Sequence, residues 1–186
     1  MLAAVLSRVA GAAVVGYLLG SFPTADLVSR AEDVDLRTVG DRNPGWWNAR
    51  EALGRRSALP VLLGDIAKGF LAAAVGRAMA REGQWWMPYV SGGAAMVGHA
   101  WPVFARFRGG RAVATLGGVA AVVSPRSLGI AMGAGAATYA ATHSVQRAIQ
   151  FGYVAFPLGQ LVVDGARRTA ATGALMSFVG LRFAMR

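Results

Sequence analysis

Apolar residues gather along this chain into about seven segments separated by short polar stretches. They cover roughly residues 2–28, 58–76, 86–104, 113–125, 127–142, 150–164 and 170–184. A helix needs about 20 apolar residues to cross a bilayer at 1.5 Å per residue, and several of these segments are shorter. Residues 113–142 therefore form either one broken span or two short ones, with the break at Ser124-Pro125. The pattern predicts an all-α, polytopic transmembrane bundle of about seven spans, a single integral membrane domain over residues 1–186.

Composition agrees with this class of protein. The chain is 55% hydrophobic and only 15% charged, whereas about a quarter of a soluble domain is charged. The net charge of +10 would suggest nucleic acid in a soluble chain, but these arginines lie between apolar segments, where they orient the chain and meet anionic lipid. We therefore predict membrane lipids and not nucleic acid as partners. With no cysteine and two distant histidines, we expect neither a metal site nor a cofactor.

The distribution of arginine predicts the orientation in the membrane. Two loops, 28–57 and 105–112, are the richest in arginine, whereas the loop at 77–85 has only Arg77 and Arg81. By the positive-inside rule the two richer loops face the cytoplasm, which leaves the N-terminus outside. The first apolar segment is longer than the core of a signal peptide, so we expect it to be retained as a helix.

A glycine pair between arginines is the most informative polar feature. In GHAWPVFARFRGGRAVATLGG, Gly109 and Gly110 stand between Arg108 and Arg111 and directly against two apolar segments. Glycine lets backbone N–H groups approach an anion, and arginine adds charge and fork-shaped donors. The turn predicts a phosphate site at the membrane surface. The alternative is an ordinary cytoplasmic loop that obeys the positive-inside rule.

Two ionisable residues lie inside an apolar segment. Asp65 and Lys68 are three residues apart, on one face of a helix. Charged groups at membrane depth are costly, which makes them candidates for function. The alternative is a mutually neutralising pair, with Lys68 reaching toward the interface. These two residues are also the sole support for a third interpretation, a small transporter component.

Four blocks in a fixed order carry a resemblance to a known family. They are GYLLGSFPTADL, DLR..G.RNPGWWNA...LGRR, LLGDIAKG and GHAWPVFARFRGGRAVAT, over roughly residues 14–125. Together they resemble the bacterial acyl-phosphate-dependent glycerol-3-phosphate acyltransferases, the PlsY family. The resemblance implies a multi-pass enzyme of the bacterial inner membrane, active in phospholipid biosynthesis. It would transfer a fatty acyl group from acyl phosphate to glycerol 3-phosphate and form lysophosphatidic acid.

The resemblance also implies the site residues. Those expected in catalysis are Arg37, Asp41, Asn43, Asn48 and His99. Those expected to bind substrate are Gly40, Gly45, Arg50, Asp65, Lys68, Arg108, Gly109, Gly110 and Arg111.

Some positions depart from the family pattern. Asp41 stands where the family has a serine, and Arg108 and Arg111 stand where it has lysines. The family's segment with His, Asn and Glu after the last span has no counterpart in residues 1–186. A catalytically impaired relative that binds phosphate-bearing lipid is therefore the alternative to an active acyltransferase.

Overall fold

The computed structural model describes residues 2–185, and within this range all regular structure is helical, as predicted. The helices are α1 (Leu2–Gly20), α2 (Thr24–Ala31), α3 (Trp46–Met79), α4 (Met87–Ala100), α5 (Val113–Val123), α6 (Pro125–Thr142), α7 (Val145–Val163) and α8 (Ala166–Ala184), with a short 3-10 turn η1 (Val103–Ala105) before α5.

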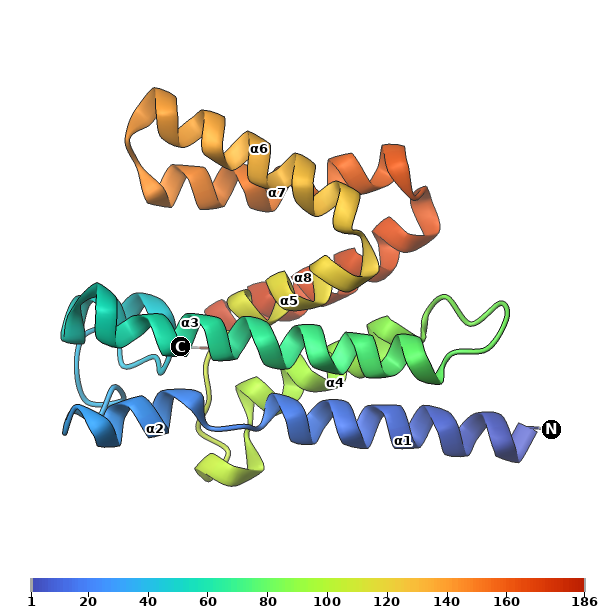
Figure 1. Cartoon of the computed structure of the whole chain (residues 1–186), viewed down its shortest axis with the longest axis horizontal. Helices are drawn as coiled ribbons and strands as arrows, with labels where there is room; N and C mark the ends of the chain where they lie inside the picture. The colour runs from blue at the N-terminus through green and yellow to red at the C-terminus, as the bar shows by residue number, and fades with distance from the viewer. Residues whose placement is uncertain (1, 186) are drawn as a thin grey trace.

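The helices form a main bundle and a diverging hairpin (Figure 1). Helix α1 packs against α3 and α4, and α5 packs against α3. Helices α6 and α7 pack closely on each other and lean away from the rest of the bundle. Two stretches, Leu2–Ala31 and Trp46–Met79, are long and apolar enough on their own to cross a membrane. The count of seven spans stays a prediction.

Glycine allows the bundle helices to touch through their backbones. A Cβ added at Gly20 would lie 2.0 Å from the carbonyl oxygen of Ala95, where α1 meets α4. A Cβ at Gly118 would lie 2.0 Å from the carbonyl oxygen of Ile66, where α5 meets α3. Helices in lipid associate through such close packing, because lipid offers no hydrophobic drive for helices to associate.

Two helix boundaries differ from the expectation, and a third decides between two alternatives that the sequence left open. The first apolar segment breaks after Gly20 and resumes at Thr24, with Pro23 just before α2. Helix α3 begins at Trp46, before the apolar segment, and kinks at Gly54, where φ is +81°. Residues 113–142 form two helices, because Pro125 lacks an N–H and begins α6 in a first turn that needs no such donor.

We expect the two ends of the bundle to face opposite sides of the membrane, with the arginine-rich end inside. The loops at 28–57 and 105–112 lie toward one end, and the loop at 77–85 lies at the other (Figure 1). Single cysteines at Ser57 and Gln84 can be placed in this cysteine-free chain. In intact cells a membrane-impermeant thiol reagent should label Gln84→Cys and reach Ser57→Cys only after permeabilisation. The reverse pattern would invert the orientation.

Candidate functional site

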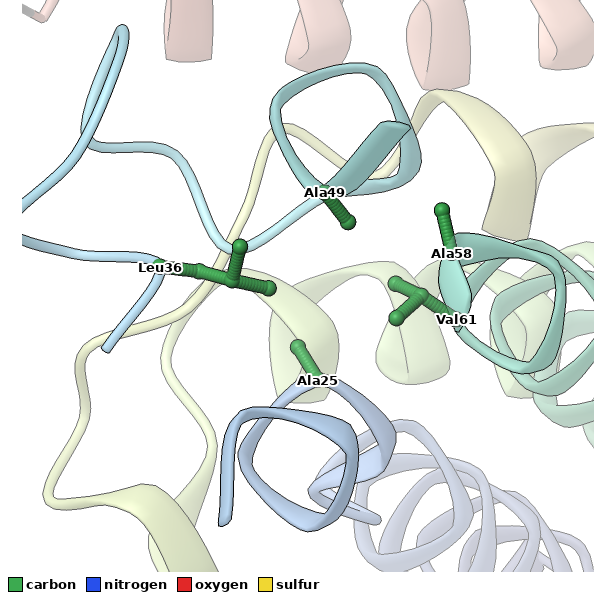
Figure 2. Packing of buried hydrophobic residues seen from close by; sticks show 5 residues of the cluster. All are labelled: Ala25, Leu36, Ala49, Ala58 and Val61. Carbon is green, nitrogen blue, oxygen red and sulfur yellow. The ribbon is translucent and has the colours of Figure 1, made fainter. Parts of the chain in front are cut away.

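A buried leucine fixes the loop between α2 and α3. Leu36 is fully buried, and Figure 2 shows its side chain between α2 and both parts of the kinked α3. Its neighbours in this cluster are Ala25, Ala49, Ala58 and Val61. Anchoring Leu36 places the next residue, Arg37, at the edge of the helix bundle.

Asn48 and Gly40 hold the same loop. The Asn48 side chain is buried and donates through Nδ2 to the carbonyl oxygens of Leu36 and Val39, at 2.7 and 3.1 Å. Gly40 has φ +55°, and a Cβ there would lie 2.0 Å from Asn48 Oδ1. Neither residue lines the polar pocket described below. In this structure the Asn48 donors position the loop that carries Arg37, and a catalytic role for Asn48 stays a prediction.

Arg37 links its own loop to α2 and to the turn before α5. Its Nη1 lies 2.6 Å from Asp26 Oδ1 on α2. Its Nε and Nη2 donate to the carbonyl oxygen of Arg108, at 3.1 and 2.7 Å. Arg108 thus contributes its backbone here, while its side chain is exposed. Asp26 was not predicted, although it stands in the block GYLLGSFPTADL.

The backbone donors of the glycine pair are already engaged. The N–H of Gly109 donates to the carbonyl of Ala100 at 3.2 Å, and that of Gly110 donates to the carbonyl of His99 at 3.1 Å. In this structure these N–H groups bond to carbonyls and not to a substrate, and their contact with a phosphate stays a prediction. Glycine is needed here for close approach, because a Cβ at Gly109 would lie 1.9 Å from the His99 carbonyl oxygen. A Cβ at Gly110 would lie 2.4 Å from His99 Nε2.

A buried charged cluster lies beneath this turn. Lys68 Nζ is 2.8 Å from Asp65 Oδ1, and His99 Nδ1 faces the same oxygen at 3.4 Å. All three side chains are almost completely buried. A carboxylate facing Nδ1 favours the tautomer with the proton on that nitrogen, which leaves Nε2 as an acceptor. The sequence suggested the Asp65–Lys68 pair but not its contact with His99.

These groups share one small pocket. Its volume is about 20 Å³, enough for one water molecule, so a larger anion requires the surrounding loops to separate. The predicted residues that line it are Arg37, Asp65, Lys68, His99, Gly109 and Gly110, joined by Asp26, Thr24 and Pro44. The structure thus brings together six predicted residues from four separate parts of the chain.

An ion pair lies beside this turn. Asp41 Oδ2 is 2.8 Å from Arg111 Nη1, and Asp41 Oδ1 accepts the backbone N–H of Asn43 at 3.1 Å. The Arg111 guanidinium also lies 4.5 Å from the centre of the Phe183 ring on α8. Asn43 is buried, and a Cβ at Gly45 would lie 2.7 Å from its Nδ2. The aspartate at the family's serine position therefore engages one of the two arginines of the glycine turn.

Arg182 on α8 donates hydrogen bonds to carbonyls at the glycine turn, and it was not among the predicted site residues. It is 9% exposed and donates to the carbonyl oxygen of Gly110 at 3.3 Å and to that of Ala100 at 3.5 Å. Its guanidinium lies 4.7 Å from the Trp101 ring centre. A charged residue within a predicted apolar span is a candidate for function, and this criterion applies to Arg182 as it does to Asp65 and Lys68.

A large apolar cleft separates the α6–α7 hairpin from α3 and α5. Its volume is about 710 Å³, and its lining is mainly aliphatic and aromatic. Arg50 and Arg55 are the charged residues among those that line it. The Arg50 guanidinium lies 5.6 and 5.3 Å from the ring centres of Trp46 and Trp47. Arg50 is among the residues predicted to bind substrate, and the structure places it at the apolar cleft.

Comparison with solved structures identifies the class as an integral membrane protein. The chain is similar to the crystal structure of PlsY (YgiH), an integral membrane glycerol 3-phosphate acyltransferase, in its glycerol 3-phosphate form. The TM-score is 0.83 at 26% identity, over 95% of this chain and 88% of that one. For the lysophosphatidic acid form the TM-score is 0.79 at 25% identity, over 94% and 87% of the two chains.

The chain belongs to the glycerol-3-phosphate acyltransferase family, whose model matches residues 10–185. The likeness thus extends well past residue 125, where the sequence motifs ended. A glycerol-3-phosphate acyltransferase of Exiguobacterium sibiricum is 45% identical over 63% of this chain and 56% of that protein. One from Rubrobacter xylanophilus is 46% identical over 60% and 55%. The matched region thus spans a little over half the length of these relatives.

Proposed function

We propose that this protein transfers a fatty acyl group from acyl phosphate to glycerol 3-phosphate, forming lysophosphatidic acid. It would do so as one integral membrane domain in a bacterial inner membrane. The observation that carries the proposal is the pocket in which Arg37, Lys68 and His99 meet beside the Gly109-Gly110 turn. The family match and the likeness to PlsY support it.

The pocket offers cationic donors for a phosphate. Lys68 has three N–H donors, of which Asp65 and the Phe22 carbonyl occupy two, at 2.8 and 3.5 Å. Arg37 lies at the rim and has five N–H donors, three of which contact Asp26 and the Arg108 carbonyl. Both cations already face a carboxylate, so binding is expected to depend on an exchange of partners as the loops open.

The cluster beneath the turn also offers a base. In the proposed step the substrate hydroxyl oxygen bonds to the acyl carbon, and its proton passes to His99 Nε2. The bond from that carbon to the phosphate oxygen breaks, and phosphate leaves with the electron pair. Asp65, facing His99 Nδ1 at 3.4 Å, orients the ring and stabilises it when charged. Because phosphate is a good leaving group, positioning and charge stabilisation are the main demands on the protein.

The apolar cleft suits the fatty acyl chain. At about 710 Å³ and with a largely apolar lining, it lies within the size range of ligand pockets. Arg50 and Arg55 give it a positive region for the acyl phosphate headgroup.

A weakened relative is the second candidate, favoured by the Asp41–Arg111 ion pair. The carboxylate engages an arginine that a phosphate could otherwise use, and it repels anionic substrates.

One assay tests both candidates. We expect the purified protein to form lysophosphatidic acid from acyl phosphate and glycerol 3-phosphate at low turnover. Asp41→Ser should lower KM for glycerol 3-phosphate about fivefold, because a partly exposed ion pair is worth about 1 kcal/mol. Asp41→Ser both removes the charge and adds a hydroxyl. Asp41→Ala separates these two effects, because it removes the charge alone. Absence of product from all three forms would reject the acyltransferase. High wild-type activity that Asp41→Ser destroys would make Asp41 a working part of the site.

A further inference from the structure

A second polar pocket lies at the opposite end of the bundle from the candidate site. Its volume is about 280 Å³, and three arginines line it: Arg77 near the end of α3, Arg81 in the following loop and Arg168 in α8. Trp85 and Tyr89 also contribute to its wall. Several lining residues belong to the α3–α4 loop, and this loop lies at one end of the bundle, whereas the glycine turn lies toward the other end (Figure 1).

Two of these arginines are held in place by the end of α5. Arg77 Nη1 donates to the carbonyl oxygen of Val122 at 3.3 Å, and Arg168 Nη1 donates to that of Val123 at 3.4 Å. These carbonyls form the negative end of the helix dipole, where a cation is stabilised. Each contact uses one of the five donors of a guanidinium. The remaining donors of both side chains are therefore positioned but not consumed.

The pocket keeps an excess of positive charge. Among residues 2–185, no carboxylate lies within ion-pair distance of Arg77 or Arg81. Arg168 faces Asp164 at 4.0 Å, and that carboxylate also accepts a hydrogen bond from Ser124. No acidic side chain belongs to the pocket lining in the described part of the chain.

Membrane orientation does not account for these arginines. The positive-inside rule favours arginine at the cytoplasmic end, and this pocket lies at the end predicted to face outward. Capping of α5 explains Arg77 and Arg168 but not Arg81, which makes no such contact in the structure. An anionic ligand would account for all three.

We propose that this pocket binds the phosphate of an anionic phospholipid headgroup. Arginine forks match phosphate oxygens, and basic pockets between membrane helices are suited to such headgroups. Trp85 and Tyr89, edge to face with ring centres 5.9 Å apart, supply the aromatic character typical of the bilayer interface. Inorganic phosphate offers the same charge without the acyl chains that would extend along the bundle. The site is separate from the proposed acyl transfer and does not depend on it.

Native mass spectrometry of the full chain, released from micelles with phosphatidylglycerol or phosphatidylcholine, tests the proposal. We expect wild type to retain one phosphatidylglycerol preferentially and Arg81→Gln to bind it about tenfold more weakly. Arg81 is chosen for substitution because, unlike Arg77 and Arg168, its side chain does not contact the end of α5. Arg126→Gln is the matched control, since Arg126 is exposed near this end but does not line the pocket.

Three results would overturn the assignment. Equal retention of phosphatidylcholine would show that the pocket does not select for an anionic headgroup. Equal weakening by Arg126→Gln would mean diffuse attraction and not a pocket. Complete displacement of the lipid by millimolar inorganic phosphate would identify a site for the free anion. A far-ultraviolet spectrum and thermal midpoint of Arg81→Gln equal to wild type would assign its weaker binding to the site itself.

Discussion

Lys68→Met should lower the free energy of unfolding by about 3 kcal/mol and abolish acyl transfer. The substitution removes one member of a buried ion pair 2.8 Å apart and leaves the Asp65 carboxylate short of a partner. Breaking a buried pair from one side costs about 3–5 kcal/mol, because the remaining charge has lost its water as well as its partner. Denaturant unfolding in micelles measures the first effect, and formation of lysophosphatidic acid measures the second.

The double variant Asp65→Asn/Lys68→Met separates stability from function. It removes both charges while nearly keeping their volume, so most of the lost stability should return. Activity should not return, because His99 then lacks its carboxylate and the pocket lacks its ammonium group. Arg30→Met is a control for loss of positive charge, since Arg30 is exposed and outside the pocket. If the double variant regains activity along with stability, the pair is structural and the mutual-neutralisation interpretation holds.

Local patterns explain how much of this fold the sequence could predict. Apolar runs identify helices because a helix in lipid must present apolar side chains over its whole length. Spacing within one helix also predicts which side chains lie on the same face, and Asp65 and Lys68 do pair across one turn. Helix ends were less predictable: α3 extends back to Trp46 because aromatic and polar residues also form helix there, beyond the apolar segment.

The site could be predicted in its residue types but not in its contacts. His99 meets Asp65, and Arg37 meets Asp26, only after α2, α3 and α4 have packed, and no spacing along the chain encodes this. The glycine turn shows the same limit. Its sequence is compatible with N–H groups directed at an anion, and packing against the end of α4 decided that they bond to carbonyls instead. Arg182 was overlooked although its place in an apolar segment should have marked it, as it marked Lys68.

The role of the glycine turn leads to the second large effect. Gly110→Ala should lower kcat about a hundredfold, with a smaller change in KM for glycerol 3-phosphate. The new methyl group would lie 2.4 Å from His99 Nε2, so the ring must move away from the position where it accepts a proton. Loss of a positioned general base typically costs a factor of about 10²–10⁴ in rate. Because the N–H of Gly110 is bonded to the His99 carbonyl, the substitution removes no donor to the substrate.

Two other glycines, Gly109 and Gly180, make this prediction specific. Gly109→Ala should fail to give folded protein, because its methyl group would lie 1.9 Å from a backbone oxygen that cannot move independently of α4. Gly180→Ala should leave folding and activity intact, since a Cβ there meets no atom within 4 Å. Steady-state kinetics at varied glycerol 3-phosphate, with a thermal midpoint for each variant, distinguish the cases. A higher KM at unchanged kcat in folded Gly110→Ala would mean that the turn holds the phosphate after all, and that His99 Nε2 does not take the proton.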